Sequence, residues 1–317
     1  IGNRLSSYAT GNDFCKFARE AEIVVVDIDP GEFKKETVKI DQFIQSDAKV
    51  FLEKLLEIEF KFKIENWLNK CLHWKKIFGS VEDEFTTSSK IDLYELCDVL
   101  SDILPDECSL VTDSGYNEVI LPTNIKFKNG QNTIHPISQG SMGFALAGAV
   151  GAYYAKKDNV FVVVGDGSIM MNLQELQTID EYNLPIKTFV FNNDGYLMIK
   201  HTQKNLFKGN YVAVNKDTNI SCPNLKKLAA AFNMKYYLIK NWNDYNNKIK
   251  KILNNKRPVI CEIIMNPEQY FHPKLGTTIN KKGKIISPPL EDLSPLLSRK
   301  ELKKNMIISI HSKSEEI

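Results

Sequence analysis

Two motifs rich in glycine and oxygen-bearing side chains directly follow segments of strand length that are rich in apolar residues. Gly165-Asp166-Gly167-Ser168 follows Val160–Val164, and Asn192-Asn193-Asp194-Gly195 follows Ile186–Phe191. Such apolar runs are typical of buried parallel strands, and Leu173–Tyr182 between them has the pattern of a crossover helix. Because parallel strands joined in this way end at the same edge of a sheet, we expect both motifs at the edge where open α/β sheets bind ligands.

The side chains of these motifs suit a divalent cation bound to a diphosphate. Asp166 offers a carboxylate, Asn193 offers an amide oxygen 27 residues later, and Gly195 offers a loop carbonyl. Three hard oxygen ligands would leave the other octahedral positions of Mg²⁺ to diphosphate oxygens and water. The spacing therefore predicts a metal site at Asp166, Asn193 and Gly195.

The residues beside Asp166 could contact the diphosphate itself. Gly165 and Gly167 allow close approach of the backbone, Ser168 carries a hydroxyl donor, and the next helix is expected to point its positive end at the phosphates. A plain Asp-Gly turn between a strand and a helix would also give Gly-Asp-Gly. The pairing with Asn192-Asn193 at this spacing favours the cofactor site.

The elements that must position these residues alternate between helix and strand from Ile91 to about Asn266. The pattern covers Leu93–Ile103, Ser109–Thr112, Gly140–Lys156, Val160–Val164, Leu173–Tyr182, Ile186–Phe191, Asn224–Phe232 and Val259–Met265. Residues 91–270 are therefore predicted to form an α/β domain, a three-layer, doubly wound parallel sheet that binds the diphosphate.

Three further parts of the chain flank this domain. Residues 1–60 hold one strand and one amphipathic helix, too few elements for a whole domain, and are predicted to be the C-terminal part of a second α/β domain. Residues 61–90 begin with a helical stretch, become polar and are predicted to be a linker; residues 271–317 are predicted to be an irregular C-terminal tail. The sequence opens inside the first pattern, so we expect a C-terminal fragment of a longer subunit.

Gly-Asp-Gly followed by Asn-Asn resembles the motif of thiamine-diphosphate-dependent enzymes, and the resemblance to the acetolactate synthase large subunit group covers most of the chain. Residues 139–152 are similar to the family's Gly-x-Met-Gly segment. The resemblance implies that Gly140 lies at the cofactor and that Met142 supports it from below, forcing its two rings into a V that brings the amino group to the reacting carbon. The alternative for Met142 is a gap-filling core methionine. Met171 matches a second family methionine, with a core residue at a helix start as its alternative.

The resemblance extends to two more segments. Residues 112–117 are similar to the family's first diphosphate loop, in which Ser114 and Gly115 fit; Tyr116 and Asn117 depart from the usual Gln-His and leave their side-chain roles open. Residues 1–32 are similar to the central domain, which binds FAD in acetolactate synthases with an arginine at the position of Arg4. Because many relatives keep this domain without FAD, FAD is a possible cofactor that we do not favour, and a surface role for Arg4 is preferred.

The implied activity is thiamine-diphosphate- and Mg²⁺-dependent decarboxylation of a small-molecule 2-oxo acid, such as pyruvate, with carboligation to a second carbonyl. Simple decarboxylation to an aldehyde is the alternative within enzymes. In the family, a glutamate from the neighbouring subunit's pyrimidine-binding domain starts the reaction. This sequence contains no such domain, so we expect the chain alone to be inactive, and an inactive cofactor-binding remnant is the alternative of another class. The resemblance also implies a homodimer or tetramer with its active site at the subunit interface.

The segment after Asn193 bears on the second substrate. Acetolactate synthases typically place a tryptophan where Thr202 stands, so a strict acetolactate assignment is weakened. Residues 209–212, 221–223 and 289–295 resemble acetolactate-synthase-like enzymes of bacterial surface-sugar pathways. His201 could contact substrate, but an exposed loop histidine is the preferred interpretation.

Composition argues against other classes of protein. The 41 Lys and Arg residues nearly balance 39 Asp and Glu residues, which gives little support for nucleic-acid or membrane-surface binding. The six cysteines form no Cys-x-x-Cys pair and read as reduced thiols. With no long apolar stretch, we expect a cytoplasmic protein.

Overall fold

The computed structural model describes residues 1–11, 13–78, 90–136 and 139–317, and its internal contacts divide the chain into two units. Unit 1 comprises Ile1–Phe78 with Phe271–Ile317, and unit 2 comprises Gly79–Tyr270. The division differs from the boundaries expected from the sequence, because both the helical start of the expected linker and the expected tail belong to unit 1. The rest of the expected linker, residues 79–89, lies outside the described residues.

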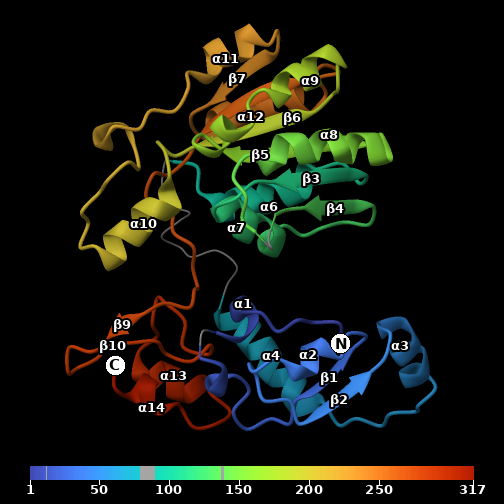
Figure 1. Cartoon of the computed structure of the whole chain (residues 1–317), viewed down its shortest axis with the longest axis vertical. Helices are drawn as coiled ribbons and strands as arrows, with labels where there is room; N and C mark the ends of the chain where they lie inside the picture. The colour runs from blue at the N-terminus through green and yellow to red at the C-terminus, as the bar shows by residue number, and fades with distance from the viewer. Residues whose placement is uncertain (12, 79–89, 137–138) are drawn as a thin grey trace. The chain divides into compact units, whose positions relative to one another are not determined.

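Unit 2 alternates helices and strands, as the apolar pattern predicts (Figure 1). Its elements are α6 (Leu93–Ile103), β3 (Cys108–Thr112), α7 (Tyr116–Asn124), β4 (Gln131–Ile134), α8 (Phe144–Lys156), β5 (Asn159–Gly165), the 3-10 turn η2 (Ser168–Met171), α9 (Glu175–Glu181), β6 (Lys187–Asn192), α10 (Leu197–Leu206), the 3-10 turn η3 (Lys216–Thr218), α11 (Leu225–Ala231), β7 (Lys235–Ile239), α12 (Trp242–Leu253) and β8 (Val259–Ile264). The predicted α/β class is confirmed.

The six strands of the described part of unit 2 run parallel in the order β4-β3-β5-β6-β8-β7. The chain passes outward from β3 to β4 and then crosses back to β5 on the other side of β3. The strand order therefore reverses between β3 and β5, which is the topological switch point where open sheets form a ligand crevice at the carboxyl ends of the strands.

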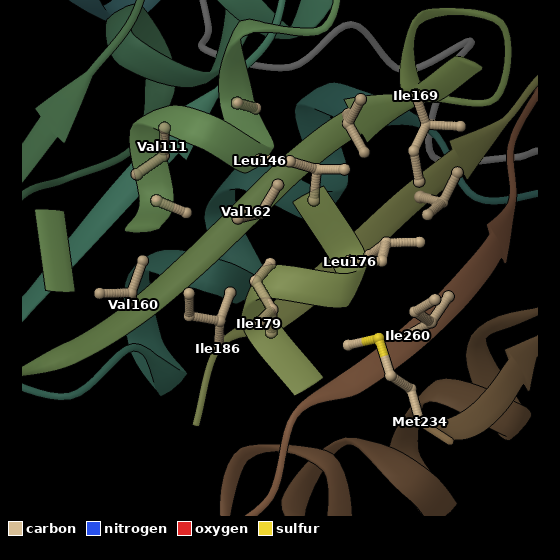
Figure 2. Packing of buried hydrophobic residues seen from close by; sticks show 14 of the residues in the cluster. Val111, Leu146, Val160, Val162, Ile169, Leu176, Ile179, Ile186, Met234 and Ile260 are labelled. Atoms are coloured by element: carbon tan, nitrogen blue, oxygen red, sulfur yellow. The ribbon is translucent and has the colours of Figure 1, made fainter. Parts of the chain in front are cut away.

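One face of the sheet buries a continuous apolar cluster (Figure 2). Alternate residues of β5, Val160, Val162 and Val164, belong to one cluster with residues of α8, α9 and α11, among them Leu146, Leu176, Ile179 and Leu225. Phe161 and Val163 are equally buried and, with a period of two, point to the opposite face, where α7 packs against β3 and β5. Helices on both faces hold the strand ends in a fixed register.

Unit 1 consists of short elements. They are α1 (Ser7–Thr10), the 3-10 turn η1 (Phe14–Lys16), β1 (Val24–Asp27), α2 (Gly31–Lys34), β2 (Gln42–Gln45), α3 (Ala48–Leu56), α4 (Glu65–Ile77), β9 (Thr278–Ile279), β10 (Ile285–Ile286), α13 (Arg299–Asn305) and α14 (Ser312–Glu315). β1 and β2 pair in parallel, and Asp47 caps α3 by accepting from the Lys49 and Val50 amides. Arg4 is largely exposed and lies 3.8 Å from Glu32.

The segment expected to be an irregular tail is ordered by contacts with the start of the chain. Lys16 Nζ donates to the Ser287 carbonyl at 2.6 Å, Arg19 pairs with Glu291 at 2.8 Å, and Trp74 Nε1 donates to the Asn305 carbonyl at 3.2 Å. Sequence periodicity does not reveal these contacts because they join residues more than 200 positions apart. None of the helices in the described part of the chain has the length and apolar character needed to cross a membrane.

Candidate functional site

A pocket of about 280 Å³ lies at the carboxyl ends of β3, β5 and β6, beside the switch point of the sheet. It brings together most of the residues that the sequence predicts: Ser114, Gly115, Gly140, Met142, Gly165, Gly167, Ser168, Asn193 and Gly195. Asp166 is 1% exposed and lies beneath the lining between Gly165 and Gly167. Unit 1 has a larger cavity of about 660 Å³, but its lining is mostly apolar and includes none of these residues.

Two of the predicted metal ligands, Asp166 and Asn193, each have one side-chain oxygen that forms no hydrogen bond within the protein. Oδ1 of Asp166 and Oδ1 of Asn193 are both buried and have no hydrogen-bond partner, while the Gly195 amide donates to Oδ2 of Asp166 at 2.9 Å. Leaving a buried carboxylate or amide oxygen unsatisfied costs stability, and a bound cation would remove that cost. The donor set fits Mg²⁺, which prefers oxygen ligands and completes its shell with phosphate and water.

The surroundings of Asp166 set its titration. Burial raises the pKa of Asp166 to about 6, against the opposing hydrogen bonds from the Gly195 amide and the Cys222 thiol. A cation at Oδ1 would favour the charged form in turn. No group of three His, Cys, Asp or Glu side chains with metal-binding geometry occurs among the described residues.

The loop that carries Asn193 is fixed by its neighbours. Asn192 Nδ2 donates to Glu262 of β8 at 2.6 Å, and Oδ1 of Asn192 accepts from the Asp194 amide at 3.1 Å. Gly195 has φ +119°, and a Cβ there would lie 2.1 Å from the Val214 carbonyl oxygen. Only glycine fits this turn, which directs the Gly195 amide to Asp166.

The structure changes the expected role of Ser168. Its hydroxyl donates to the carboxylate of Asp113 and accepts from the Gly143 amide at 3.2 Å, so the hydroxyl proton is not directed to a phosphate. The helix predicted at Leu173–Tyr182 is present as α9 (Glu175–Glu181), but η2 (Ser168–Met171) separates its N-terminal end from Gly167. A helix terminus next to the pocket instead comes from α7, whose N-cap is Gly115 with φ +108°.

The two methionines that the sequence singled out have different positions. Met142 lines the pocket and is 41% exposed. Met171 does not line the pocket and instead packs against Gly143, where an added Cβ would lie 2.7 Å from the Met171 Cβ. This contact and φ +83° at Gly143 require glycine next to Met142.

Helix α10 contributes residues that the sequence did not single out. Leu197, Met198 and Ile199 line the pocket as apolar residues at the start of the helix that follows the Asn-Asn motif. His201 was expected to be an exposed loop residue, but this prediction was wrong: it is 2% exposed on α10. Its ring stacks on Tyr270 at 4.1 Å, and its Nδ1 bonds the hydroxyl of Tyr116. The neighbours of His201 in the sequence are polar, so the sequence pattern does not indicate that its side chain is buried.

Residues 113–263 match the family described as "Thiamine pyrophosphate enzyme, C-terminal TPP binding domain". The fold, the pocket and this match together define a thiamine-pyrophosphate-binding domain, so the chain belongs to the thiamine pyrophosphate enzymes. Within them it is a relative of acetolactate synthase large subunits, and the resemblance seen in the sequence is confirmed.

Three curated relatives illustrate this relationship. The probable acetolactate synthase large subunit of Methanococcus aeolicus is 31% identical over 284 residues, which cover 84% of this chain and 46% of that protein. The corresponding protein of Methanocaldococcus jannaschii is 32% identical over 85% of this chain and 46% of its own length. The acetolactate synthase large subunit of Porphyra purpurea is 28% identical over 94% of this chain and 51% of its own length. The chain thus spans about half the length of the curated relatives it matches.

A solved structure supports the fold. The thiamine diphosphate-dependent 4-hydroxybenzoylformate decarboxylase of Rhodococcus jostii RHA1 superimposes with a TM-score of 0.62 over 78% of this chain and 44% of its own, at 20% identity.

Proposed function

We propose that unit 2 binds thiamine diphosphate with Mg²⁺, as part of an enzyme that decarboxylates a 2-oxo acid and joins the product to a second carbonyl compound. The observation that carries the proposal is the pair of buried, unpartnered oxygens on Asp166 and Asn193. They follow adjacent strands and flank a pocket lined by glycines, which is the arrangement that a magnesium diphosphate needs.

Each predicted residue has a role in this proposal. Asp166, Asn193 and the Gly195 carbonyl would hold Mg²⁺. Backbone groups of Ser114, Gly115, Gly165, Gly167 and Ser168 would contact the diphosphate, and the N-terminal end of α7 would favour its negative charge.

The remaining lining positions the organic part of the cofactor and shields it. Met142 would support the cofactor from below, with Gly140 beside it, and Met171 would act only indirectly through its contact with Gly143. When bound, thiamine diphosphate supplies the carbon nucleophile and stabilises the electron pair released by decarboxylation. Leu197, Met198 and Ile199 form an apolar wall that would exclude water from this reactive centre. Exclusion of water favours attack on a second carbonyl over protonation.

Thr202 of α10 bears on which second carbonyl compound, the acceptor, the enzyme would use. Thr202, which stands where acetolactate synthases typically have tryptophan, is exposed and donates to its own helix at the Met198 carbonyl, 3.0 Å away. We therefore propose an acetolactate-synthase-like carboligase with a different acceptor, such as one used in surface-sugar biosynthesis. It would act as a homo-oligomer whose subunit interface completes the active site.

Calorimetric titration of the chain with Mg²⁺ and thiamine diphosphate tests the cofactor proposal. Asp166→Asn should weaken binding by about tenfold to a hundredfold, because a charged metal ligand is lost. Asp106→Asn is the matched control: it removes one carboxylate charge that is 87% exposed and lies before the amino end of β3, away from the pocket. Equal affinities for both variants and the unaltered chain would refute the assignment of the metal site.

The reaction is tested by measuring pyruvate consumption and products with and without added carbonyl acceptors, in a preparation that also contains the pyrimidine-binding half. A ligated product supports carboligation. Release of aldehyde alone, whatever the acceptor, would favour simple decarboxylation instead.

A further inference from the structure

The loops that line the pocket meet at one buried carboxylate, that of Asp113, which directly follows β3 and is 0% exposed. Oδ1 accepts from the Ser114 amide at 2.9 Å, from the Gly143 amide at 3.0 Å and from the Ser168 hydroxyl. Oδ2 accepts from the Ala145 amide at 2.8 Å. Four donors from three separate loops therefore converge on one side chain.

These hydrogen bonds compensate for burying the Asp113 carboxylate away from water. Among the described residues, no Lys, Arg or His forms an ion pair with Asp113, so its compensation comes from the three amides and the hydroxyl. Two of the amides belong to the first turn of α8, whose N-cap is Gly143 and therefore lacks a side chain to cap it. Asp113 thus caps α8 from a different loop, where the positive end of the helix favours a carboxylate.

The same contacts set the position of two pocket residues. Binding of the Gly143 amide fixes the turn that presents Met142, and binding of the Ser168 hydroxyl fixes the start of η2 after Asp166. The Gly143 amide also donates to Ser168 Oγ at 3.2 Å, so the two loops are joined to each other through Asp113. No such link would be needed merely to build the sheet, because all three loops lie beyond the strand ends.

We propose that Asp113 is the positioning residue of the cofactor pocket, which fixes the loop of Met142 and the loop of Asp166 and Ser168 relative to the first diphosphate loop. This inference rests on the proposed function, because thiamine diphosphate with Mg²⁺ is the ligand that the three loops would bind in common. Asparagine at position 113 would keep Oδ1 but place an N–H group of its amide against the Ala145 N–H. It would also remove the charge that strengthens the other three bonds.

The test compares Asp113→Asn with Val162→Ala in the otherwise unaltered chain. Val162 is a fully buried core residue of β5 that does not line the pocket, so Val162→Ala lowers stability without touching the loops. Calorimetric titration with Mg²⁺ and thiamine diphosphate should show binding weakened about tenfold or more by Asp113→Asn, from loss of hydrogen bonds to a charged group, and unchanged by Val162→Ala. An affinity within twofold of the unaltered chain for Asp113→Asn overturns the inference.

Amide hydrogen exchange gives a readout that needs no cofactor. In Asp113→Asn the Gly143 and Ala145 amides should exchange at least tenfold faster, whereas Val162→Ala should leave their rates relative to the core amides of α8 unchanged. If the unaltered chain does not bind the cofactor, the proposed function fails, and the exchange rates alone decide the inference.

Because a substitution at a deeply buried carboxylate can lower the stability of the whole fold, Ser168→Ala provides a second variant. It removes one of the four donors and should accelerate exchange at Gly143 by a smaller factor. Unchanged exchange at Gly143 in either variant overturns the inference.

Discussion

Replacing Gly195 by alanine would place a methyl group 2.1 Å from the Val214 carbonyl oxygen and 3.1 Å from its carbon. That carbonyl already accepts from the Tyr196 amide at 2.8 Å, so it is held where the new methyl group must go. The backbone at Gly195 also has φ +119°, a conformation that alanine rarely adopts. Either the Val214 segment or the Gly195 turn must move.

The cost follows from the contacts that would be lost. Backbone strain of this kind costs about 1–3 kcal/mol, and loss of the Gly195 hydrogen bond to the Asp166 carboxylate costs about 1.5–3 kcal/mol. The expected destabilisation is therefore about 3–5 kcal/mol, out of a total that is typically about 5–15 kcal/mol. At about 2–4 °C per kcal/mol for a unit of this size, the melting temperature should fall by about 10 °C.

Thermal unfolding and titration with Mg²⁺ and thiamine diphosphate check this expectation. Gly151→Ala is the matched control, since a Cβ at Gly151 meets no atom within 4 Å and the residue lies within helix α8. It should stabilise the chain by about 0.5–1 kcal/mol and leave cofactor affinity unchanged. If Gly195→Ala melted and bound the cofactor like the unaltered chain, the geometry assigned to the Asn193 loop would be wrong.

Three further predictions concern protons and packing. Burial raises the pKa of Asp166 from 3.8 to about 6, so ionising this carboxyl destabilises the cofactor-free chain by an amount that grows as the pH rises from 3.8 to 6 and is full above pH 6. Mg²⁺-dependent binding measured by calorimetry should weaken about tenfold per unit below pH 6, because the metal needs the ionised carboxylate. Burial lowers the pKa of Lys187 from 10.5 to about 8; its destabilising effect is therefore full below pH 8 and fades as pH rises to 10.5. Lys187→Met should stabilise the chain at pH 7 by about 1–3 kcal/mol in denaturant unfolding and flatten the profile above pH 8. Ile179→Ala, in the fully buried core, should destabilise by about 2–5 kcal/mol in the same measurement, and a loss below 1 kcal/mol would contradict the packing in Figure 2.

The central strands of unit 2 could be predicted because they are buried on both faces. β5 carries the uninterrupted apolar run Val160–Val164, and β6 carries the apolar run Phe189–Phe191. Helix α6 begins and ends at the predicted residues, with Asp92 accepting from the Tyr94 amide at 2.8 Å. The edge strands β4 and β7 were missed, because each has one neighbouring strand and keeps polar or half-exposed residues. α12 had a readable signal that was overlooked, namely buried Tyr245, Ile249 and Ile252 at helical spacing.

The sequence was enough to predict which residues gather at the site, but not which hydrogen bonds they form there. Asp166 and Asn193 follow adjacent strands, so their proximity depends on topology alone. The direction of the Ser168 proton depends on Asp113, 55 residues earlier, and no local pattern reports it. A signal was present nonetheless: an acidic residue directly after the buried strand Cys108–Thr112 must find donors or a cation where it lies.

The switch point explains why that residue is Asp113. The connection through α7 leaves β3 toward β4, whereas the connection through α8 returns past β3 to β5, so right-handed crossovers place the two helices on opposite faces. The end of β3 is thus the position from which one side chain reaches the loop before α7, the loop before α8 and the loop after β5. A carboxylate there accepts from all three loops through Oδ1 and from the Ala145 amide through Oδ2, whereas a neutral amide would offer no acceptor to the Ala145 amide and no charge to strengthen the other bonds. The switch point between β3 and β5 therefore has two consequences: it opens the crevice that can bind a ligand, and it places Asp113 where it can hydrogen-bond all three loops that line that crevice.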